Sequence, residues 1–556
     1  MGLNVRLLLP PPSPSLLRRS SRMITVCLRE LMHSLGPVAC ASQRTCSVKP
    51  RTLCVHDPAA PRSGSPERDM IWAALLGGLL TLVLLYFSRR RQDNEPPLDK
   101  GALPWLGHAL EFGRDAAKFL ARMKEKHGDV FTVRVAGQYI TVLLDANSFD
   151  SVLNDTVSLD FVKSKNQLLE RIFFLKLPGL QPAAEREWME QHFHGFRLSN
   201  LSGTMKANIE SLLLSDVKGG SASGWRQDGL FNFCYSLLFR AGYLTLFDSA
   251  DNVTAIYKEF RKFDKLLSKL VRGSLKKGET HTVNSSRKRL WELLSADWLS
   301  RASGSISWQQ SYNRFLEKEG VDMEMQRRAS LLQLWTTQCN NGPAAFWLLG
   351  FLLTHPEAME ALKSEIRQFN LQDPAVRHQT SGSPDSRRTP VFDSILSETL
   401  RLTAAVLISR VVVGDKVLRM ASGQQYKLRR GDKVILFPFL SPQMDPEIHL
   451  EPQSFKYDRF LNIDMSMKDT FYKNEGRLKY YTMPWGAGRH ACVGKEFAVA
   501  TIKQFVFFIL THFDLETCDP QAKLPPVNPS RYGLGMLQPE GELQVRYRLK
   551  RSQPET

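Results

Sequence analysis

One uninterrupted hydrophobic run stands out along the chain. It is MIWAALLGGLLTLVLLYF, Met70 to Phe87, and none of its 18 residues is charged. A run of this length is long enough to cross a bilayer as a helix. Arg89, Arg90 and Arg91 follow directly, and basic residues flank the cytosolic side of a span. The pattern therefore predicts a transmembrane signal anchor over residues 70–88, with the rest of the chain in the cytosol.

Residues 114–556 have mainly helical periodicity. The helical pattern of residues 115–128 ends at Gly128. Residues 130–145 alternate between apolar and polar positions around Ala136-Gly137, which predicts a β-hairpin. Short strands are expected at residues 411–418, 433–437 and 543–549. We therefore expect one large domain that is mainly α with small β-sheets.

Two segments outside this domain differ from it in composition. Residues 89–113 are basic and then rich in proline and glycine, so we interpret them as a stiff linker. Residues 1–69 are rich in Arg, Ser and Pro and poor in acids, which is also typical of a mitochondrial transit peptide. The anchor that follows favours a different interpretation, an N-terminal extension that is disordered or absent from the mature protein. Met70 would then be a natural start.

The net charge of +18 narrows the choice of partners. Residues 1–69 hold 10 Lys or Arg and 4 Asp or Glu, which supply +6 and leave +12 for the rest. A basic body of this kind suits an anionic membrane surface. We find no nucleic-acid motif and expect no nucleic-acid partner. The 8 cysteines are scattered without a CxxC pair, which predicts reduced thiols in the cytosol.

The clearest chemical motif is WGAGRHACVG, Trp485 to Gly494. Gly486 and Gly488 allow tight turns, and an apolar helix is expected from about Lys495. Cys492 lies just before that helix, where free N–H groups and the helix dipole stabilise a thiolate. Such a thiolate can be the sulfur ligand of a haem iron. On its own, a buried cysteine is usually a small core residue.

This loop resembles the haem-ligand loop of the cytochrome P450 family. The resemblance implies the cytochrome P450 fold and a haem b cofactor whose iron takes its axial thiolate from Cys492. Trp485 stands where the family usually has Phe. His490 stands where a basic residue, commonly Arg, contacts a haem propionate, and we expect His490 to make that contact.

Further residues match propionate contacts of the family. Arg410, in AAVLISRVVV, occupies a position where many members contact a propionate. Trp188 and His192, in WMEQH, have the spacing of the helix that touches the other propionate, although Arg is usual in place of His192. The alternative for this pair is a core tryptophan and a surface histidine.

A second motif is structural. Glu398 and Arg401, in SETLRL, are spaced i, i+3 on one predicted helix face. An isolated exposed pair would contribute only about 0.3 kcal/mol. The pair also resembles the family's Glu-x-x-Arg motif, which joins a later arginine, here Arg459 in FKYDRF. The resemblance implies that these three residues are structural and not catalytic.

The stretch TQCNNGPAAFW, Thr337 to Trp347, interrupts an apolar helical pattern with glycine and proline. Proline inside a helix costs about 3 kcal/mol. In the family this helix crosses the distal face of the haem, and an acid and a threonine deliver protons to bound dioxygen. Gly342 and Pro343 take those two positions. Asn340 keeps a hydrogen-bond donor and acceptor and is expected to bond a substrate oxygen. The alternative is a tolerated kink.

Longer segments, among them LQLWTTQCNNGPAAFWLL and LFPFLSPQMDPEI, resemble a narrower branch of the family. That branch rearranges the fatty-acid endoperoxide prostaglandin H2. The resemblance implies an isomerase of the endoplasmic reticulum membrane that cleaves the O–O bond by homolysis, with no dioxygen and no obligatory reductase. Asn340 and Cys492 are its expected catalytic residues. Trp335 and Leu537 are expected to line the substrate pocket, with a place in the core as the alternative for Trp335.

Two alternatives stay open. A sterol or oxysterol monooxygenase from a related branch would need dioxygen, a reductase and a proton route that avoids Gly342-Pro343. A haem carrier or sensor is the other, because nothing in the sequence blocks the open face of the iron.

Overall fold

The computed structural model describes residues 66–87, 91–218, 224–248, 252–299, 306–371 and 389–550. Residues 1–65 of the predicted extension lie outside this part of the chain.

The predicted anchor is helical. Helix α2 runs from Pro66 to Phe87, and its described side chains, from Met70 to Val83, are exposed. This described portion is apolar but shorter than a full membrane span. Among the described residues, helix α9 (Leu230–Phe247) is the one that reaches the length and hydropathy of a span, but 78% of it is buried, as in the core helix of a globular body.

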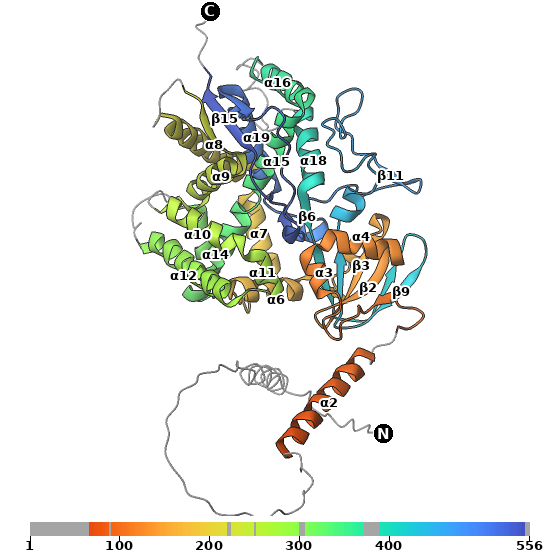
Figure 1. The fold of residues 1–556 in the computed structure, drawn as a ribbon. Helices are drawn as coiled ribbons and strands as arrows, with labels where there is room; N and C mark the ends of the chain where they lie inside the picture. The colour runs from red at the N-terminus through yellow and green to blue at the C-terminus, as the bar shows by residue number, and fades with distance from the viewer. Residues whose placement is uncertain are drawn as a thin grey trace, which may run out of the picture. The chain divides into compact units, whose positions relative to one another are not determined.

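One side of the body contains a mixed sheet, in which the strand order is β1-β2-β3-β10-β7-β4. Strands β2 (Val130–Val135) and β3 (Gln138–Leu143) form the predicted hairpin. Its turn residues Ala136 and Gly137 have φ of 48° and 77°, which a tight hairpin turn requires. Helices α3 (Ala109–Arg114) and α4 (Ala116–His127) lie against β2, as Figure 1 shows.

Part of the predicted linker belongs to this sheet. Strand β1 (Leu98–Asp99) pairs in parallel with β2. Glu95 is 5% exposed, and its carboxylate accepts a hydrogen bond of 2.8 Å from Nη2 of Arg429. The body therefore begins well before residue 114. The prolines of this segment disfavour helix, but strand β1 and the ion pair between Glu95 and Arg429 still attach the segment to the body.

The remaining strands form the rest of the large sheet and four small sheets. They are β4 (Leu159–Asp160), β5 (Arg226–Gly229), β6 (Ala404–Val406), β7 (Ile408–Val412), β8 (Lys416–Arg419), β9 (Gln425–Leu428), β10 (Lys433–Leu436), β11 (Tyr472–Lys473), β12 (Gly476–Arg477), β13 (Phe513–Thr517), β14 (Leu534–Met536) and β15 (Gln544–Leu549). The single strand expected at residues 411–418 is two strands, because the chain turns between Val412 and Lys416.

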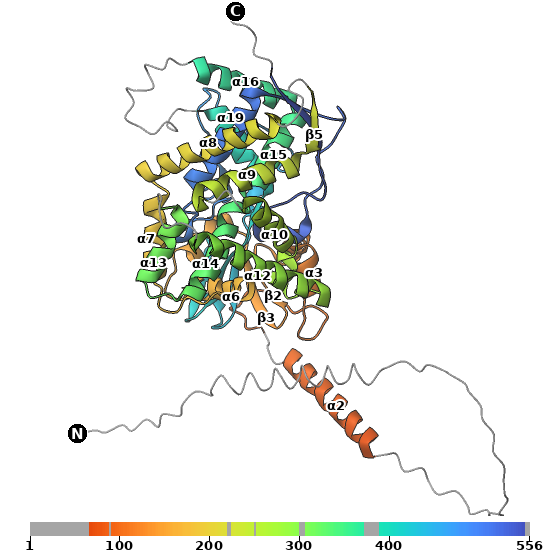
Figure 2. The same ribbon diagram turned by 90° about the vertical axis from the view of Figure 1, so that its left-hand side faces the viewer.

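Helices make up most of the body. Besides those named above, they are α5 (Asp150–Leu153), α6 (Phe161–Phe173), α7 (Pro182–His192), α8 (Gly195–Lys218), α10 (Val253–Lys265), α11 (Leu267–Arg272), α12 (Lys277–Leu299), α13 (Trp308–Lys318), α14 (Met323–Gln338), α15 (Asn341–Thr354), α16 (Pro356–Leu371), α18 (Pro390–Thr403) and α19 (Lys495–His512). In both ribbon views α9 and α15 run side by side in the helical part of the body, with α8 and α19 beside them (Figures 1 and 2).

The helix interrupted by glycine and proline is in fact two helices. Helix α14 ends at Gln338 and α15 begins at Asn341, with Cys339 and Asn340 between them. Pro343 therefore lies in the first turn of α15, where a missing backbone N–H costs little. The break places Asn340 at the wall of a cavity, and Asn341, the first residue of α15, lines it as well.

Candidate active site

A cavity of about 870 Å³ lies between the large sheet and the helical part of the body. Its wall comes from α6, α7, the α14–α15 break, β7, the segment before α19, and β14. Cys492, His490, Arg410 and Asn340 all line it. The structure thus brings together four residues that lie up to 152 positions apart in the sequence, as the numbers of Asn340 and Cys492 show.

The Cys492 loop is held by its own backbone. Gly486 and Gly488 have φ of 68° and 65°, and the N–H of Cys492 donates to the carbonyl of Trp485 at 2.9 Å. Helix α19 begins at Lys495, three residues after the thiol. Burial raises the pKa of the Cys492 thiol, while the N–H of Gly494 and the charge of Arg186 act in the opposite direction. The loop thus presents one sulfur to the cavity with backbone N–H groups beside it.

Arg410 and His490 both lie against the ring of Phe161. The Arg410 guanidinium is 4.9 Å from the centre of the Phe161 ring, and the His490 ring stacks on it at 4.1 Å. Arg410 is 2% exposed, and among the described residues no carboxylate forms an ion pair with it. Burial and the neighbouring cations, Arg410 first among them, lower the pKa of His490 to about 4. The imidazole is therefore neutral at pH 7 and can donate one hydrogen bond.

Three further cations, which the sequence analysis did not assign, reach the same cavity. Lys165 comes from α6, Arg186 from α7 and Arg489 from the cysteine loop. Lys165 pairs with Glu185 at 3.1 Å, and Nη1 of Arg186 donates to the carbonyl of Ala491 at 3.1 Å. No local motif marks the first two, because only tertiary packing brings α6 and α7 to this wall.

Trp188 and His192 do not line the cavity. Their rings stack at 3.8 Å, Nδ1–H of His192 donates to the carbonyl of Trp188 at 2.8 Å, and Arg197 lies 2.9 Å from its Nε2. The alternative stated for this pair, an aromatic that packs on the core and a histidine at the surface, describes the arrangement better. The neighbouring Arg186 and Lys165 reach the cavity instead, and each is paired with a carboxylate, Glu190 at 2.8 Å and Glu185 at 3.1 Å respectively.

Trp335 and Leu537 also lie outside the cavity wall. Trp335 packs in the helical core, with its ring centre 6.0 Å from that of Phe173. Leu537 is fully buried, and its carbonyl accepts a hydrogen bond of 2.8 Å from Nε1 of Trp347. Met536, one residue before Leu537, is the one that faces the cavity. Trp335 does not reach the cavity because Thr336 and Thr337 occupy the side of α14 that faces the cavity at this turn.

Asn340 lines the cavity from the α14–α15 break. Its Oδ1 accepts a hydrogen bond of 3.1 Å from the N–H of Met536. Asn341 and Ala344 also line the cavity, but Gly342 and Pro343 do not. The break therefore presents amides to the cavity and no carboxylate. The nearby Thr336 and Thr337 hydroxyls both donate to the carbonyl of Gln333, at 3.1 and 2.7 Å.

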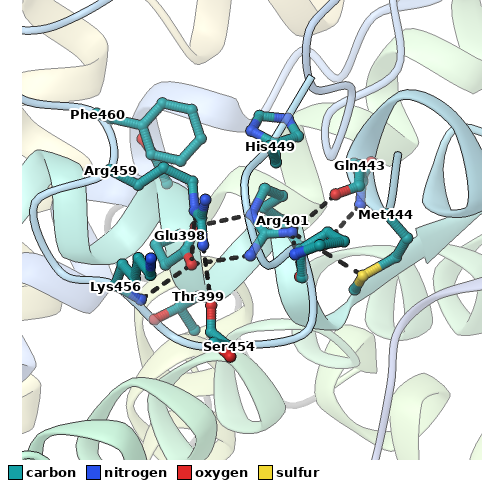
Figure 3. A network of polar contacts seen from close by, with 12 residues as sticks. Glu398, Thr399, Arg401, Gln443, Met444, His449, Ser454, Lys456, Arg459 and Phe460 are labelled. Carbon is teal, nitrogen blue, oxygen red and sulfur yellow. Dashed lines mark hydrogen bonds and ion pairs between the residues drawn. The ribbon is translucent and has the colours of Figure 1, made fainter. Parts of the chain in front are cut away.

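Glu398, Arg401 and Arg459 form a buried network, drawn in Figure 3. Arg401 donates to both carboxylate oxygens of Glu398, at 2.7 and 2.8 Å, and Nε of Arg459 donates to the same oxygens at 3.0 and 2.9 Å. Arg401 also donates to the carbonyls of Gln443 and Pro452. The network joins α18 to residues 443–459 and does not line the cavity.

Comparison with known proteins decides the family. A family model described as "Cytochrome P450" matches residues 340–545. Prostacyclin synthase of Rattus norvegicus is 49% identical over 501 residues, covering 86% of this chain and 100% of that protein. This chain belongs to the cytochrome P450 family. Prostacyclin synthase of Homo sapiens is also 49% identical, over 500 residues and the same shares of both chains.

More distant relatives are consistent with this assignment. The 7-alpha-hydroxycholest-4-en-3-one 12-alpha-hydroxylase of Homo sapiens is 41% identical over 498 residues, covering 86% of this cytochrome P450 and 99% of the relative. The solved structure of retinoic acid bound cyanobacterial CYP120A1 has a TM-score of 0.64 at 17% identity, covering 82% of this chain and 99% of that one. The mainly α fold with small β-sheets is thus confirmed as the cytochrome P450 fold.

Haem with a cysteine thiolate on its iron is the cofactor of this family, and the cavity fits it. Cys492 supplies one sulfur at the wall. Arg410 is a buried cation that pairs with no carboxylate of the described residues, and its burial lowers its pKa. A buried charge of this kind is costly unless an opposite charge meets it, and haem propionates are such charges.

Proposed function

We propose that this cytochrome P450 is an isomerase that converts prostaglandin H2 to prostacyclin, by homolysis of the endoperoxide O–O bond and rearrangement, without dioxygen or a reductase. The identity of 49% to two prostacyclin synthases, each covered in full, supports this proposal. The identity to the human sterol 12-alpha-hydroxylase is lower, 41%.

The observation that carries the proposal is the α14–α15 break. At this position the wall holds the amides of Asn340 and Asn341 and no carboxylate. Delivery of protons to bound dioxygen needs groups that exchange protons near neutral pH, and amides do not. An endoperoxide already contains the O–O bond that is to be cleaved, so its isomerisation needs no such delivery.

The residues that line the cavity have different roles in the proposed reaction. Cys492 supplies the thiolate to the haem iron. Arg410 and His490 would hold the propionates, with Arg186 and Arg489 also at this side of the cavity. The haem, when bound, supplies the electron exchange that O–O homolysis needs. Asn340 donates a hydrogen bond from Nδ2 to a substrate oxygen, because its Oδ1 is already bonded to Met536.

Asn340 can take this role because its orientation is fixed. A backbone N–H only donates, so the atom that meets the N–H of Met536 must be the amide oxygen. The NH2 group is then the part of the side chain available to a ligand. An endoperoxide oxygen only accepts hydrogen bonds, so the two match.

The proposed location is the membrane of the endoplasmic reticulum, with one span and a cytosolic catalytic domain. The uncharged run from Met70 to Phe87, helical within α2, supports a span over residues 70–88. Residues 1–69 are then a dispensable extension, residues 89–113 lead from the span into the body and include strand β1 of its large sheet, and residues 114–556 form the rest of the haem domain. Deleting residues 1–69 should leave membrane attachment and turnover unchanged in fractionated cells. A soluble truncated protein, or a mitochondrial full-length protein, would refute this arrangement.

The test of the activity separates the two enzyme classes. Purified haem-loaded protein receives prostaglandin H2 in one set of reactions, and a 12α-unsubstituted sterol in another. Each set is run with and without NADPH and reductase. The proposal predicts prostacyclin in both prostaglandin reactions and no sterol hydroxylation. Hydroxylated sterol, formed only with reductase and dioxygen, would establish the monooxygenase instead.

A further inference from the structure

The hydrogen bond from Met536 to Asn340 depends on where β14 lies. Met536 is the last residue of β14, which pairs antiparallel with β6, with Met536 opposite Ala404. Gly535 has φ of 101°, and a Cβ on it would lie 2.8 Å from Oδ1 of Asn340. The segment therefore runs directly beside the amide of Asn340, so a small shift of β14 moves that amide.

One carboxylate holds the segment on both sides of Met536. Asp264, near the end of α10, is fully buried. Its Oδ1 accepts a hydrogen bond of 2.9 Å from Nη2 of Arg531, and its Oδ2 accepts one of 2.8 Å from Nε2 of Gln538. Arg531 precedes Met536 by five positions and Gln538 follows it by two. Both partners are buried, at 5% and 6% exposed.

A second series of contacts leads from the Asp264 carboxylate to the backbone of the α14–α15 break. Arg261 lies 3.2 Å from Oδ2 of Asp264, and its guanidinium stands 4.2 Å from the centre of the Tyr235 ring. The hydroxyl of Tyr235 donates to the carbonyl of Cys339, the residue before Asn340, at 3.4 Å. Asp264 is thus connected both to the backbone of the break and to the strand that bonds Asn340.

We propose that Asp264 is a positioning residue for the reaction, which acts through Arg531 and Gln538 to fix the N–H of Met536 and thereby the direction of the Asn340 amide. The inference rests on the proposed function, in which Nδ2 of Asn340 bonds a substrate oxygen. Asp264 does not line the cavity. A carboxylate is suited to this task because it accepts from two donors that approach from opposite ends of the segment.

Gln538→Met is the informative variant. It removes one of the two ties to Asp264 but leaves the buried ion pair with Arg531 intact. Asp264→Asn would leave Arg531 buried without its counter-charge, which endangers folding. Gln309→Met is the matched control. Gln309 is also buried, at 3% exposed, and its Nε2 donates at 3.0 Å to Asn313 and to Ser330, away from β14.

The readout is ligand binding to the haem-loaded protein. Binding is measured by the shift of the Soret band, so no turnover is required. Two stable analogues of the endoperoxide are titrated, one that keeps a bridge oxygen and one whose bridge is all carbon. Gln538→Met should weaken binding of the oxygen analogue about tenfold, the loss expected when one hydrogen bond to the ligand is lost, and leave the carbon analogue within about twofold. Gln309→Met should change neither.

The double variant decides how the effect is transmitted. If Asp264 acts through Asn340, Gln538→Met should have no further effect in an Asn340→Ala background. Additive losses, equal losses with both analogues, or the same loss in Gln309→Met would each overturn the inference. Because these are binding measurements, they decide the role of Asp264 even if the protein fails to convert prostaglandin H2, a result that would refute the proposed function separately.

Discussion

Gly342 and Tyr235 approach so closely that only glycine fits between α15 and α9. A Cβ on Gly342 would lie 2.7 Å from the Cα of Tyr235 and 2.6 Å from its ring atom Cδ2. The first of these contacts is to backbone, which cannot move aside as a flexible side chain can. The missing acid at this position is therefore also a packing requirement, a reason that the sequence alone did not reveal.

Restoring the acid and alcohol at this point should fail. In the double variant Gly342→Asp, Pro343→Thr, the new side chain at Gly342 overlaps Tyr235, so the free energy of unfolding should fall by about 1–3 kcal/mol. Isomerisation should not become faster, because neither position lines the cavity. Urea unfolding and anaerobic turnover measure both effects.

Gly414→Ala is the control for that variant. Its Cβ would meet the Cα of Ser158 at 3.8 Å, an ordinary contact. It should change stability by less than about 0.5 kcal/mol. If the double variant were as stable as this control and turned over faster, the packing explanation would be wrong.

Cys492→Ser should abolish both the thiolate signature and turnover. A serine hydroxyl stays neutral at pH 7 and is a weak donor to iron, whereas the thiolate is anionic. The ferrous carbonyl form should lose its red-shifted Soret band. Cys518→Ser, which changes a free and exposed cysteine, should keep it. Retention of the band in Cys492→Ser would assign the ligand to another cysteine.

His449 should make the folded state sensitive to acid. It is 1% exposed, its Nε2–H donates to the carbonyl of Tyr481 at 2.9 Å, and its buried Nδ1 has no hydrogen-bond partner in the described part of the chain. Burial, with repulsion from Arg401 and Arg459, lowers its pKa to about 3 in the folded protein. In the unfolded chain the pKa is about 6.5, so below that value the unfolded state binds a proton that the folded state does not.

The free energy of unfolding should therefore fall as the pH falls from about 6.5 toward 3, on the order of 1 kcal/mol per pH unit from this residue. His449→Asn removes the titrating group and should flatten this part of the profile, even if it lowers stability at pH 7. Urea unfolding between pH 7 and pH 4 measures the slope. An unchanged slope in the variant would mean that other groups cause the acid sensitivity.

Features encoded by neighbouring residues could be predicted from the sequence. The hairpin followed from alternation around Ala136-Gly137, and the cysteine loop from its glycines and the helix after it. Glu398 and Arg401 meet because three positions bring side chains to one face of a helix. In each of these cases the structure is set by the geometry of one element, or by a loop beside it.

Features that depend on tertiary packing could not be predicted in this way. Lys165 and Arg186 reach the cavity because of the way α6 and α7 pack, which no local pattern encodes. The partner of Asn340 is Met536, 196 positions later. Trp335 was expected at the pocket, but the rotation of α14 about its axis directs this side chain to the core and Thr336 and Thr337 to the cavity.

The central claim is that turnover needs no delivered protons or electrons. Single-turnover conversion of prostaglandin H2 is followed with dioxygen excluded and with no NADPH or reductase, for wild type and for Asn340→Ala. Wild type should form prostacyclin at its full rate. Asn340→Ala should be slower by an amount equivalent to about 1–3 kcal/mol, the contribution of one hydrogen bond left unmade. A wild-type protein that stays inert until NADPH, reductase and dioxygen are added would contradict the account.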